Sequence, residues 1–472
     1  MSDSRTYSNL KMKKKIVRQN KVILFLSCVL VAFLGSYLLR SPDFTQTQDY
    51  TLFLLFLSIG LWITEAIPPF AVAILIVGFL VFSMGNNPEV DVNNYVSTWS
   101  DGVIWLFLGG FFIAEGLKKT KLDESIMAWM LPKLGTSAER ILLGIMMMTG
   151  VLSMMMSNTA CTALVLATLM PIGTLLGEKS NLMKSLLLGI PAAASFGGMG
   201  TIIGSAPNAI AVGALSGMGI QISFIEWMII GTPSALVLIF VFYLFLRKKY
   251  ELKGTHVDPS ILTFGSNNVE LDAEQKIQRR IVLAITSITM LFWFTSEWTK
   301  IPVAAISGIP IVLYTMLGII NADDVRALHW DTLMLVAGGL SLGLAIKEQG
   351  IVAYFISNIE VVNLNPILLV LIFSLATVSI SNFMSNTAAA TIVIPIGISL
   401  LSITSGLDEA IMPICIGLAA SCALLLPIST PPNALAYSTG LIEQKEFYPG
   451  GILSAIVGPF IIMLFTLAYF FI

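Results

Sequence analysis

Charged residues are scarce in this chain. Only 11% of its 472 residues are Asp, Glu, Lys or Arg, whereas a soluble domain carries roughly 25%. Apolar residues make up 56% of the chain and gather in runs that read as membrane spans of about 20 residues each. This composition excludes a soluble enzyme, a nucleic-acid-binding protein and a disordered protein. It also disfavours a porin-like barrel, whose strands would alternate apolar and polar residues.

Cysteine and histidine are scarce as well. The cysteines lie in apolar runs, at Cys28, Cys161, Cys415 and Cys422. They form no Cys-x-x-Cys pair, so neither disulfides nor a zinc site is expected. The two histidines, His256 and His329, are too few for a metal cluster. Because no Ser-His-Asp set, catalytic carboxylate pair or phosphate loop stands out either, we expect neither an enzyme nor a cofactor.

The distribution of basic residues suggests four segments. Residues 1–21 form a basic tail, which the positive-inside rule places in the cytoplasm. Residues 247–280 form a polar insert, which we expect to be a cytoplasmic linker too short to fold by itself. The apolar segments 22–246 and 281–472 are then two halves of an integral protein of the cell membrane.

The two halves repeat the same landmarks at nearly one spacing. Ser157-Asn158-Thr159 returns as Ser385-Asn386-Thr387, and Ser205-Ala206-Pro207-Asn208 returns as Thr430-Pro431-Pro432-Asn433. Gly109-Gly110 returns as Gly338-Gly339, and Trp62 returns as Trp293. Such regular recurrence indicates an internal duplication. Loop charges direct the run with Trp62 inward and the run with Trp293 outward, which is the inverted-repeat plan of secondary transporters.

The repeated triplets are the candidate binding elements. Ser, Asn and Thr favour helix N-caps, and a helix that begins inside a membrane must line a cavity. Its free N–H groups and dipole attract anions. A single triplet commonly serves only as a cap or an interhelical contact, but two inverted copies would direct two helix ends at one site. Because each end suits one carboxylate, a small dicarboxylate is the natural ligand.

Helix breaks follow both triplets. Residues 197–208 are rich in glycine and residues 427–433 in proline, and both residue types interrupt helices and expose backbone carbonyls. Carbonyl, amide and hydroxyl oxygens are hard ligands that suit Na⁺, although these rules do not select that ion uniquely. The breaks therefore predict cation sites beside the anion site.

The chain resembles the divalent anion:sodium symporter family, the INDY-type di- and tricarboxylate transporters. The matching motifs are LFLGG at 106–110, LSMMMSNTACTA at 152–163, GSAPNAIA at 204–211, SNTAAATIVIP at 385–395 and ASCALLLPISTPPNA at 420–434. The resemblance implies an all-α membrane protein with two inverted repeats, re-entrant hairpins, broken helices and about 11 spans. It further implies a scaffold domain, a transport domain, a homodimer and elevator-type movement.

The resemblance also assigns residues by matched position. The substrate carboxylates would meet Asn158, Thr159, Ser205, Asn386, Thr387 and Thr430. One sodium ion would be held around Ser153, Ser157, Asn158 and Gly204, and a second around Ser381, Met384, Asn386 and Ser429. At one point the chain departs from the family, because sodium-coupled members tend to have Thr-Glu where this chain has Ser381-Asn382. This departure bears on the second sodium site.

The expected function is secondary transport of C4-type dicarboxylates such as succinate, malate or fumarate, coupled to Na⁺. Cations would offset the charge of a dianion, which is costly in a low dielectric. One alternative is sodium-independent exchange, for instance of 2-oxoglutarate against malate, and another is transport of a tricarboxylate or of sulfate. An anion channel is a different class, but broken helices in both halves argue against it.

Overall fold

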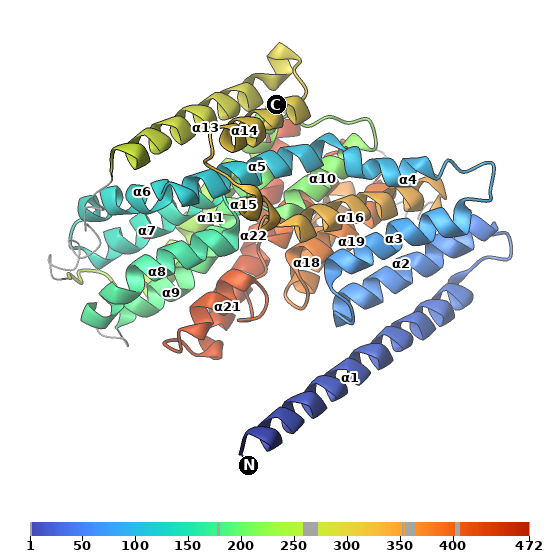
Figure 1. Ribbon diagram of the computed structural model, residues 1–472, viewed down its shortest axis with the longest axis horizontal. Coiled ribbons are helices and arrows are strands. Elements are labelled where there is room, and N and C mark those ends of the chain that lie inside the picture. Colours follow the sequence, from blue (N-terminus) through green and yellow to red (C-terminus); the bar gives the residue numbers. More distant parts are fainter. Residues whose placement is uncertain are drawn as a thin grey trace. The chain divides into compact units, whose positions relative to one another are not determined.

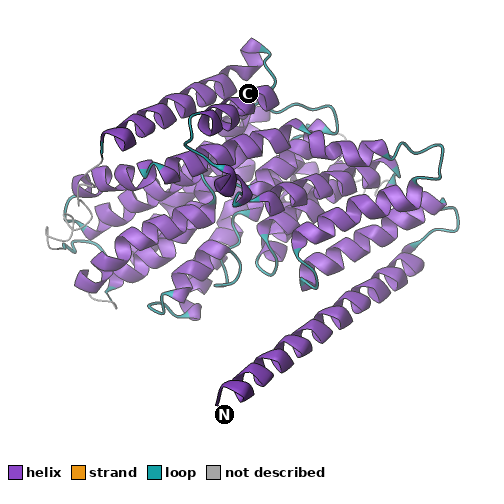
Figure 2. Ribbon diagram, viewed as in Figure 1, coloured by secondary structure: helices purple, strands orange, loops and turns teal. Residues whose placement is uncertain are grey.

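The computed structural model describes residues 2–176, 180–257, 272–351, 354, 365–401 and 406–471. Within these ranges the regular secondary structure consists of helices joined by loops, apart from one isolated bridge between Ser137 and His256 (Figure 2). Seven of the helices described are long and apolar enough to cross a membrane, and others of 10–17 residues are apolar but shorter. The all-α membrane fold expected from the sequence is therefore confirmed.

Contacts divide the chain into two compact units, the first of which joins residues 1–99 to residues 334–362. Its helices are α1 (Ser2–Leu39), α2 (Gln46–Thr64), α3 (Pro69–Met84), α4 (Asn93–Ser97) and most of α16 (Trp330–Glu348). The tail expected at 1–21 belongs to α1, although only Asn20–Leu39 qualifies as a span. Helix α2 packs against both α1 and α3, and Gly338 of α16 lies against Ala73 of α3, where a Cβ would collide with backbone.

The second unit joins residues 100–333 to residues 363–472. Its first part contains α5 (Gly102–Lys119), α6 (Leu122–Met130), η2 (Leu131–Leu134), α7 (Ala138–Ser153), α8 (Asn158–Leu176), α9 (Asn181–Gly197), η3 (Gly198–Gly200), η4 (Ile202–Gly204), α10 (Ala206–Ser216) and α11 (Phe224–Lys249). Its later part contains α13 (Ala273–Thr299), α14 (Val303–Met316), α15 (Ala322–Arg326), α18 (Pro366–Ser381), α19 (Asn386–Leu401), α20 (Ile411–Ala420), α21 (Pro431–Ser438), η6 (Gln444–Glu446) and α22 (Phe447–Phe471). The helices interrupted at the predicted breaks are α9–α10 and α20–α21.

The order of the helices repeats along the chain. The series α2, α3, α4, α5 corresponds to α13, α14, α15, α16, and the series from α7 to α11 corresponds to that from α18 to α22. The corresponding helices α11 and α22 run antiparallel. Lys249 at the end of α11 donates to Glu446 O before α22 (3.2 Å), and Tyr469 near the end of α22 donates to Glu226 Oε1 in the first turn of α11 (2.9 Å). Antiparallel packing of equivalent helices is what copies of inverted topology require.

The two series exchange contacts within the second unit. Helix α10 packs against α19 and α20, while its counterpart α21 packs against α8 and α9. Gly417 makes the first of these contacts close, because a Cβ there would lie 3.0 Å from Ala211 Cβ and 3.1 Å from Pro207 O. Each broken helix therefore rests on the hairpin of the other series.

Helices α7 and α8 form a hairpin, in which the end of α8 lies at the same end of the bundle as the start of α7. Figure 1 shows α7, α8 and α9 side by side. Arg247, near the end of α11, pairs with Glu139 at the start of α7 (2.7 Å). Lys184, in the first turn of α9, pairs with Glu446 just before α22 (2.8 Å). The start of α7 and the start of α9 thus meet the same end of α11, so the turn between α7 and α8 lies away from that end.

Candidate functional site

The two Ser-Asn-Thr triplets line one cavity of about 340 Å³. All the residues expected to meet the substrate lie on it, namely Asn158, Thr159, Ser205, Asn386, Thr387 and Thr430. Of the eight residues expected in the sodium sites, five also line it: Ser157, Asn158, Gly204, Asn386 and Ser429. The other three, Ser153, Ser381 and Met384, are buried. The structure thus brings the triplets together as the sequence predicts, and the binding roles of the individual residues stay predictions.

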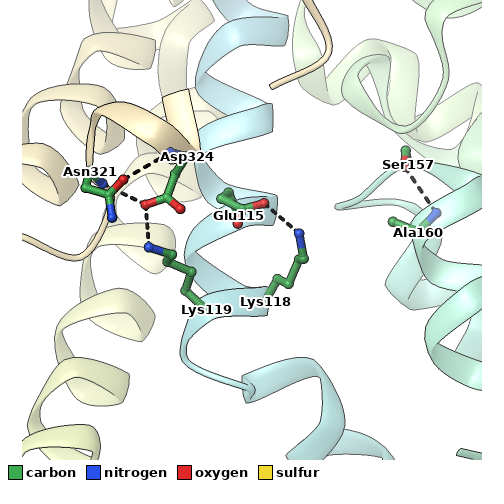
Figure 3. Close-up of polar contacts among 7 residues, drawn as sticks. All are labelled: Glu115, Lys118, Lys119, Ser157, Ala160, Asn321 and Asp324. Atoms are coloured by element: carbon green, nitrogen blue, oxygen red, sulfur yellow. Dashed lines mark hydrogen bonds and ion pairs between the residues drawn. The ribbon is translucent and has the colours of Figure 1, made fainter. Parts of the chain in front are cut away.

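Each triplet begins a helix. Ala160 N donates to Ser157 Oγ (3.3 Å) at the start of α8, as Figure 3 shows, and Ala388 N donates to Ser385 Oγ (3.2 Å) at the start of α19. The N-capping role expected for these serines is therefore confirmed. Because the first turn of a helix has no intrahelical partners for its N–H groups, both helices present free donors at the cavity.

Two further helices begin at the same cavity. Ser205 is the N-cap of α10 and Thr430 is the N-cap of α21, where Asn433 N donates to Thr430 Oγ1 (3.2 Å). Both helices have proline in their first turn, where a missing N–H costs nothing. Sequence analysis expects two helix N-termini at the binding site, those of α8 and α19, and the structure adds the N-termini of α10 and α21. The dipole of each helix places about half a positive charge at its N-terminus. The four N-termini together therefore create a positive electrostatic potential that favours a dianion, although no positively charged side chain contributes to it.

The loops before α10 and α21 are held by the same residue of the repeated motif. Asn208 Nδ2 donates to Gly198 O and Thr201 O (both 2.8 Å). Asn433 Nδ2 donates to Leu424 O (3.3 Å) and Leu426 O (3.1 Å). Both asparagines are buried, so each secures backbone carbonyls that a helix break would otherwise leave unpaired.

An oxygen cluster lies behind the first triplet. One amide atom of Asn158 lies 2.8 Å from Ser153 Oγ, 3.1 Å from Ala194 O and 3.2 Å from Gly204 O. With the amide nitrogen in this place, Asn158 donates to both carbonyls and to the Ser153 hydroxyl. Carbonyl and hydroxyl oxygens are also the ligands that a hard cation such as Na⁺ takes. Ser153, Asn158 and Gly204 of the expected first sodium site thus meet here, and the cation site itself stays a prediction.

The second series repeats part of this cluster. Ser381 Oγ donates to Asn386 Oδ1 (2.6 Å) and lies 3.1 Å from Ala420 O. Ser429 instead bonds to Asn382, donating to its backbone oxygen (3.1 Å). The expected second sodium site, which joins Ser429 to Ser381 and Asn386, stays a prediction.

Asn382 connects the tip of the second hairpin to the loop that carries Thr430. Its Nδ2 donates to Val378 O (2.9 Å), and its Oδ1 accepts from Leu425 N (2.9 Å) and Ser429 Oγ (3.1 Å). The side chain is 3% exposed. Because these bonds use both ends of the amide, Asn382 holds the loop in place from a buried position.

Asn382→Ala should destabilise the protein by about 2 kcal/mol, because it leaves the half-buried Leu425 N–H without its partner. It should also raise KM for substrate, because the loop before α21 carries Thr430. Thermal unfolding of the purified protein and initial uptake rates measure the two effects. Asn94→Ala, at an exposed position of α4, is the matched control. An unfolding temperature equal to the control's would contradict this role for Asn382.

Sequence analysis missed one wall of the cavity. It consists of Phe107, Phe111 and Ala114 on α5, and of His329, Asp331 and Thr332 at the start of α16. The α5 residues lie on the same helix face as Gly110, which belongs to a motif repeated in both halves. Their helical spacing from Gly110 could therefore have indicated this wall of the cavity. His329 was considered only as a metal ligand. Lys and Arg are missing from the lining that the structure describes, so anions would meet dipoles and hydroxyls there.

Comparison with known proteins identifies the family. The profile described as the sodium:sulfate symporter transmembrane region matches residues 20–472. The chain belongs to this family. It is therefore a membrane transporter and not an enzyme, and the resemblance to divalent anion:sodium symporters is confirmed.

Individual relatives agree with this assignment. The chain is 30% identical over 453 residues to the sodium-dependent dicarboxylate transporter SdcS of Staphylococcus saprophyticus, covering 88% of this chain and 85% of the relative. It is 31% identical over 439 residues to SdcS of Staphylococcus aureus strain USA300, covering 85% and 82%. Among solved structures, the Alcanivorax borkumensis YdaH transporter matches with a TM-score of 0.51 at 13% identity, over 90% of this chain and 98% of that one. At this identity the match supports the fold alone.

Proposed function

We propose that this transporter carries C4-type dicarboxylates such as succinate, malate or fumarate together with Na⁺. The observation that carries the proposal is the arrangement of α8, α10, α19 and α21, whose N-termini all begin at one cavity. Two of these N-termini, those of α8 and α10, belong to the first series of helices, and those of α19 and α21 belong to the second. Each carboxylate of a short dianion would therefore meet its own pair of helix N-termini. The Staphylococcus relatives, named as sodium-dependent dicarboxylate transporters, support the same substrate and ion.

The shape of the site favours a dicarboxylate over sulfate. Sulfate concentrates its charge on one small group, which one pair of helix ends would satisfy. A dicarboxylate separates its charges along a carbon chain, and a cavity of about 340 Å³ has room for such a chain. Each of the two Ser-Asn-Thr triplets that line the cavity would meet one of the two carboxylates.

Sodium coupling follows from the charge of the substrate. A dianion entering a low dielectric, against an inside-negative potential, needs compensating positive charge. The lining described here supplies neither Lys nor Arg, and the oxygen cluster around Asn158 fits a cation. Ions bound there would strengthen the pull of the α8 N-terminus on the substrate.

The proposal includes the architecture that the family implies. The antiparallel pair α11 and α22 supports two inverted repeats, with limits at 22–246 and 281–472. We further propose a homodimer in the cell membrane, with a cytoplasmic N-terminus and elevator-type movement. Exchange without sodium is the second candidate, and the amide of Asn382 within the second hairpin favours it, because a neutral group there attracts a cation less than a carboxylate does.

Uptake of radiolabelled succinate into proteoliposomes tests the proposal. An inward Na⁺ gradient should drive accumulation, and replacing Na⁺ by choline should reduce the initial rate to background. Unlabelled malate and fumarate should compete, whereas equimolar sulfate should compete weakly. Uptake that ignores sodium but requires preloaded internal dicarboxylate would establish exchange instead, and failure to transport any dicarboxylate would overturn the proposal.

A further inference from the structure

The cavity has two ionisable side chains in its described lining, His329 and Asp331. The rest of that lining consists of neutral groups, mostly hydroxyls, amides, prolines and apolar side chains. Apart from each other, these two residues have no charged neighbour in the described lining. They are therefore placed to decide which anions the cavity accepts.

His329 is fixed in position but open to the cavity. Its backbone oxygen accepts from Thr332 N (3.1 Å) in the first turn of α16. Its ring packs edge-on against Phe111 of α5, with centroids 5.7 Å apart. The side chain is exposed, and within the described part of the chain its ring nitrogens have no hydrogen-bond partner. They are therefore free to donate to a bound anion.

The other charged groups of the neighbouring elements are paired with one another. On α5, Lys118 pairs with Glu115 (3.2 Å), and Lys119 pairs with Asp324 of α15 (Figure 3). Partial burial raises the pKa of the Asp324 carboxyl, but the hydrogen bonds from Lys119 and from Asn321 N, together with the charges of Lys119 and Lys118, outweigh it and hold this pKa below its usual value.

The remaining charges of α15 are the exposed pair of Arg326 and Asp323. Asp331, in the first turn of α16, is the carboxylate that shares the cavity lining with His329. The lysines of α5 are thus engaged by carboxylates outside the lining, and the charge that faces a substrate is set by His329 and Asp331.

We propose that His329 is a specificity-determining residue that favours substrates with a third negative charge, and that Asp331 opposes it. The inference rests on the proposed dicarboxylate transport and deepens it. Two carboxylates of a tricarboxylate would take the helix N-termini, and the third would meet the imidazole on the α5 and α16 wall. An imidazole N–H that donates to this third carboxylate would favour a tricarboxylate over a dicarboxylate.

The test measures inhibition of labelled succinate uptake by citrate and by unlabelled succinate, at one pH for all variants. The readout is the ratio of the two inhibition constants, in which a uniform loss of activity cancels. Because each variant is compared with the wild type at that pH, protonation of the competitors cancels too. His329→Gln, whose side chain cannot carry a positive charge, should weaken citrate relative to succinate about tenfold.

Three further variants complete the design. His329→Lys, which carries a positive charge, should raise the citrate preference above that of His329→Gln. Asp331→Asn should shift the ratio toward citrate, opposite to His329→Gln. His256→Gln is the matched control, because His256 contacts Thr136 and lies outside the cavity lining, and it should leave the ratio unchanged.

The outcomes separate this inference from the proposed function. If the wild type takes up no dicarboxylate, the proposed function fails. If the wild type takes up succinate but His329→Gln and His329→Lys share its citrate ratio, the role of His329 is overturned. A folded but inactive His329→Gln, as judged by thermal unfolding, leaves the decision to His329→Lys, whose preference for citrate must then exceed that of the wild type.

Discussion

Asn386→Asp should reduce succinate uptake about 100-fold, because it places a negative charge beside the substrate at a cost of about 3 kcal/mol. Asn386 is the first residue of α19 and lines the cavity. Aspartate is well tolerated at a helix N-terminus, and it keeps the oxygen that accepts from Ser381 Oγ (2.6 Å). The fold should therefore survive, and the loss should reflect repulsion of the anion.

Initial uptake rates and thermal unfolding of the purified variant measure the two effects separately. Asn365→Asp is the matched control, since Asn365 caps α18 by accepting from Ile367 N (2.9 Å) and lies outside the cavity lining. It makes the same chemical change at another helix start and should transport at the wild-type rate. Wild-type uptake by Asn386→Asp would mean that the start of α19 does not meet the substrate.

Gly204→Ala should abolish sodium-dependent uptake while leaving most of the protein folded. A Cβ at Gly204 would lie 2.6 Å from Gly198 O and 3.1 Å from Ser153 O. Both contacts are with backbone, so relief requires the loop before α10 to move. That loop presents Gly204 O to the Asn158 amide (3.2 Å), and a shift of a few tenths of an ångström would spoil a cation site, since ion coordination tolerates little change in distance.

Overpacking of this kind costs about 1–3 kcal/mol of stability, which should lower the unfolding temperature without preventing folding. The decisive measurement is the stabilisation that added Na⁺ gives in thermal unfolding, which should disappear in Gly204→Ala. Gly78→Ala, on α3 where a Cβ meets nothing within 4 Å, should keep that stabilisation. Sodium stabilisation that persists in Gly204→Ala would place the cation elsewhere.

Local features of the site were predictable because they depend on neighbours in the sequence. The caps at Ser157 and Ser385 follow from a hydroxyl and the N–H groups three residues on, and both are present. The breaks between α9 and α10 and between α20 and α21 follow from glycine and proline. The all-α fold follows from long apolar runs, whose backbone groups must be satisfied within the segment.

Features that join distant segments were not predictable in this way. Asn382 could be recognised in the sequence only as a departure from the family, and the structure shows that it bonds to Leu425 and Ser429. Nothing near Asn382 in the sequence specifies those partners. The sequence divides the N-terminal segment by polarity, and only the structure shows one helix, α1, extending through both parts.

The sequence by itself determined that the chain is a helical membrane transporter, that its landmark motifs recur at nearly one spacing, and that two triplets start helices. Composition, spacing and capping are short-range properties, and each can be read without knowing where the chain goes next. Only the tertiary structure decided that four helix ends share one cavity and that α5 and His329 form its other wall. Those groups meet because the packing of α8, α10, α19 and α21 brings them together, and packing depends on the surfaces of whole helices, which single motifs do not encode.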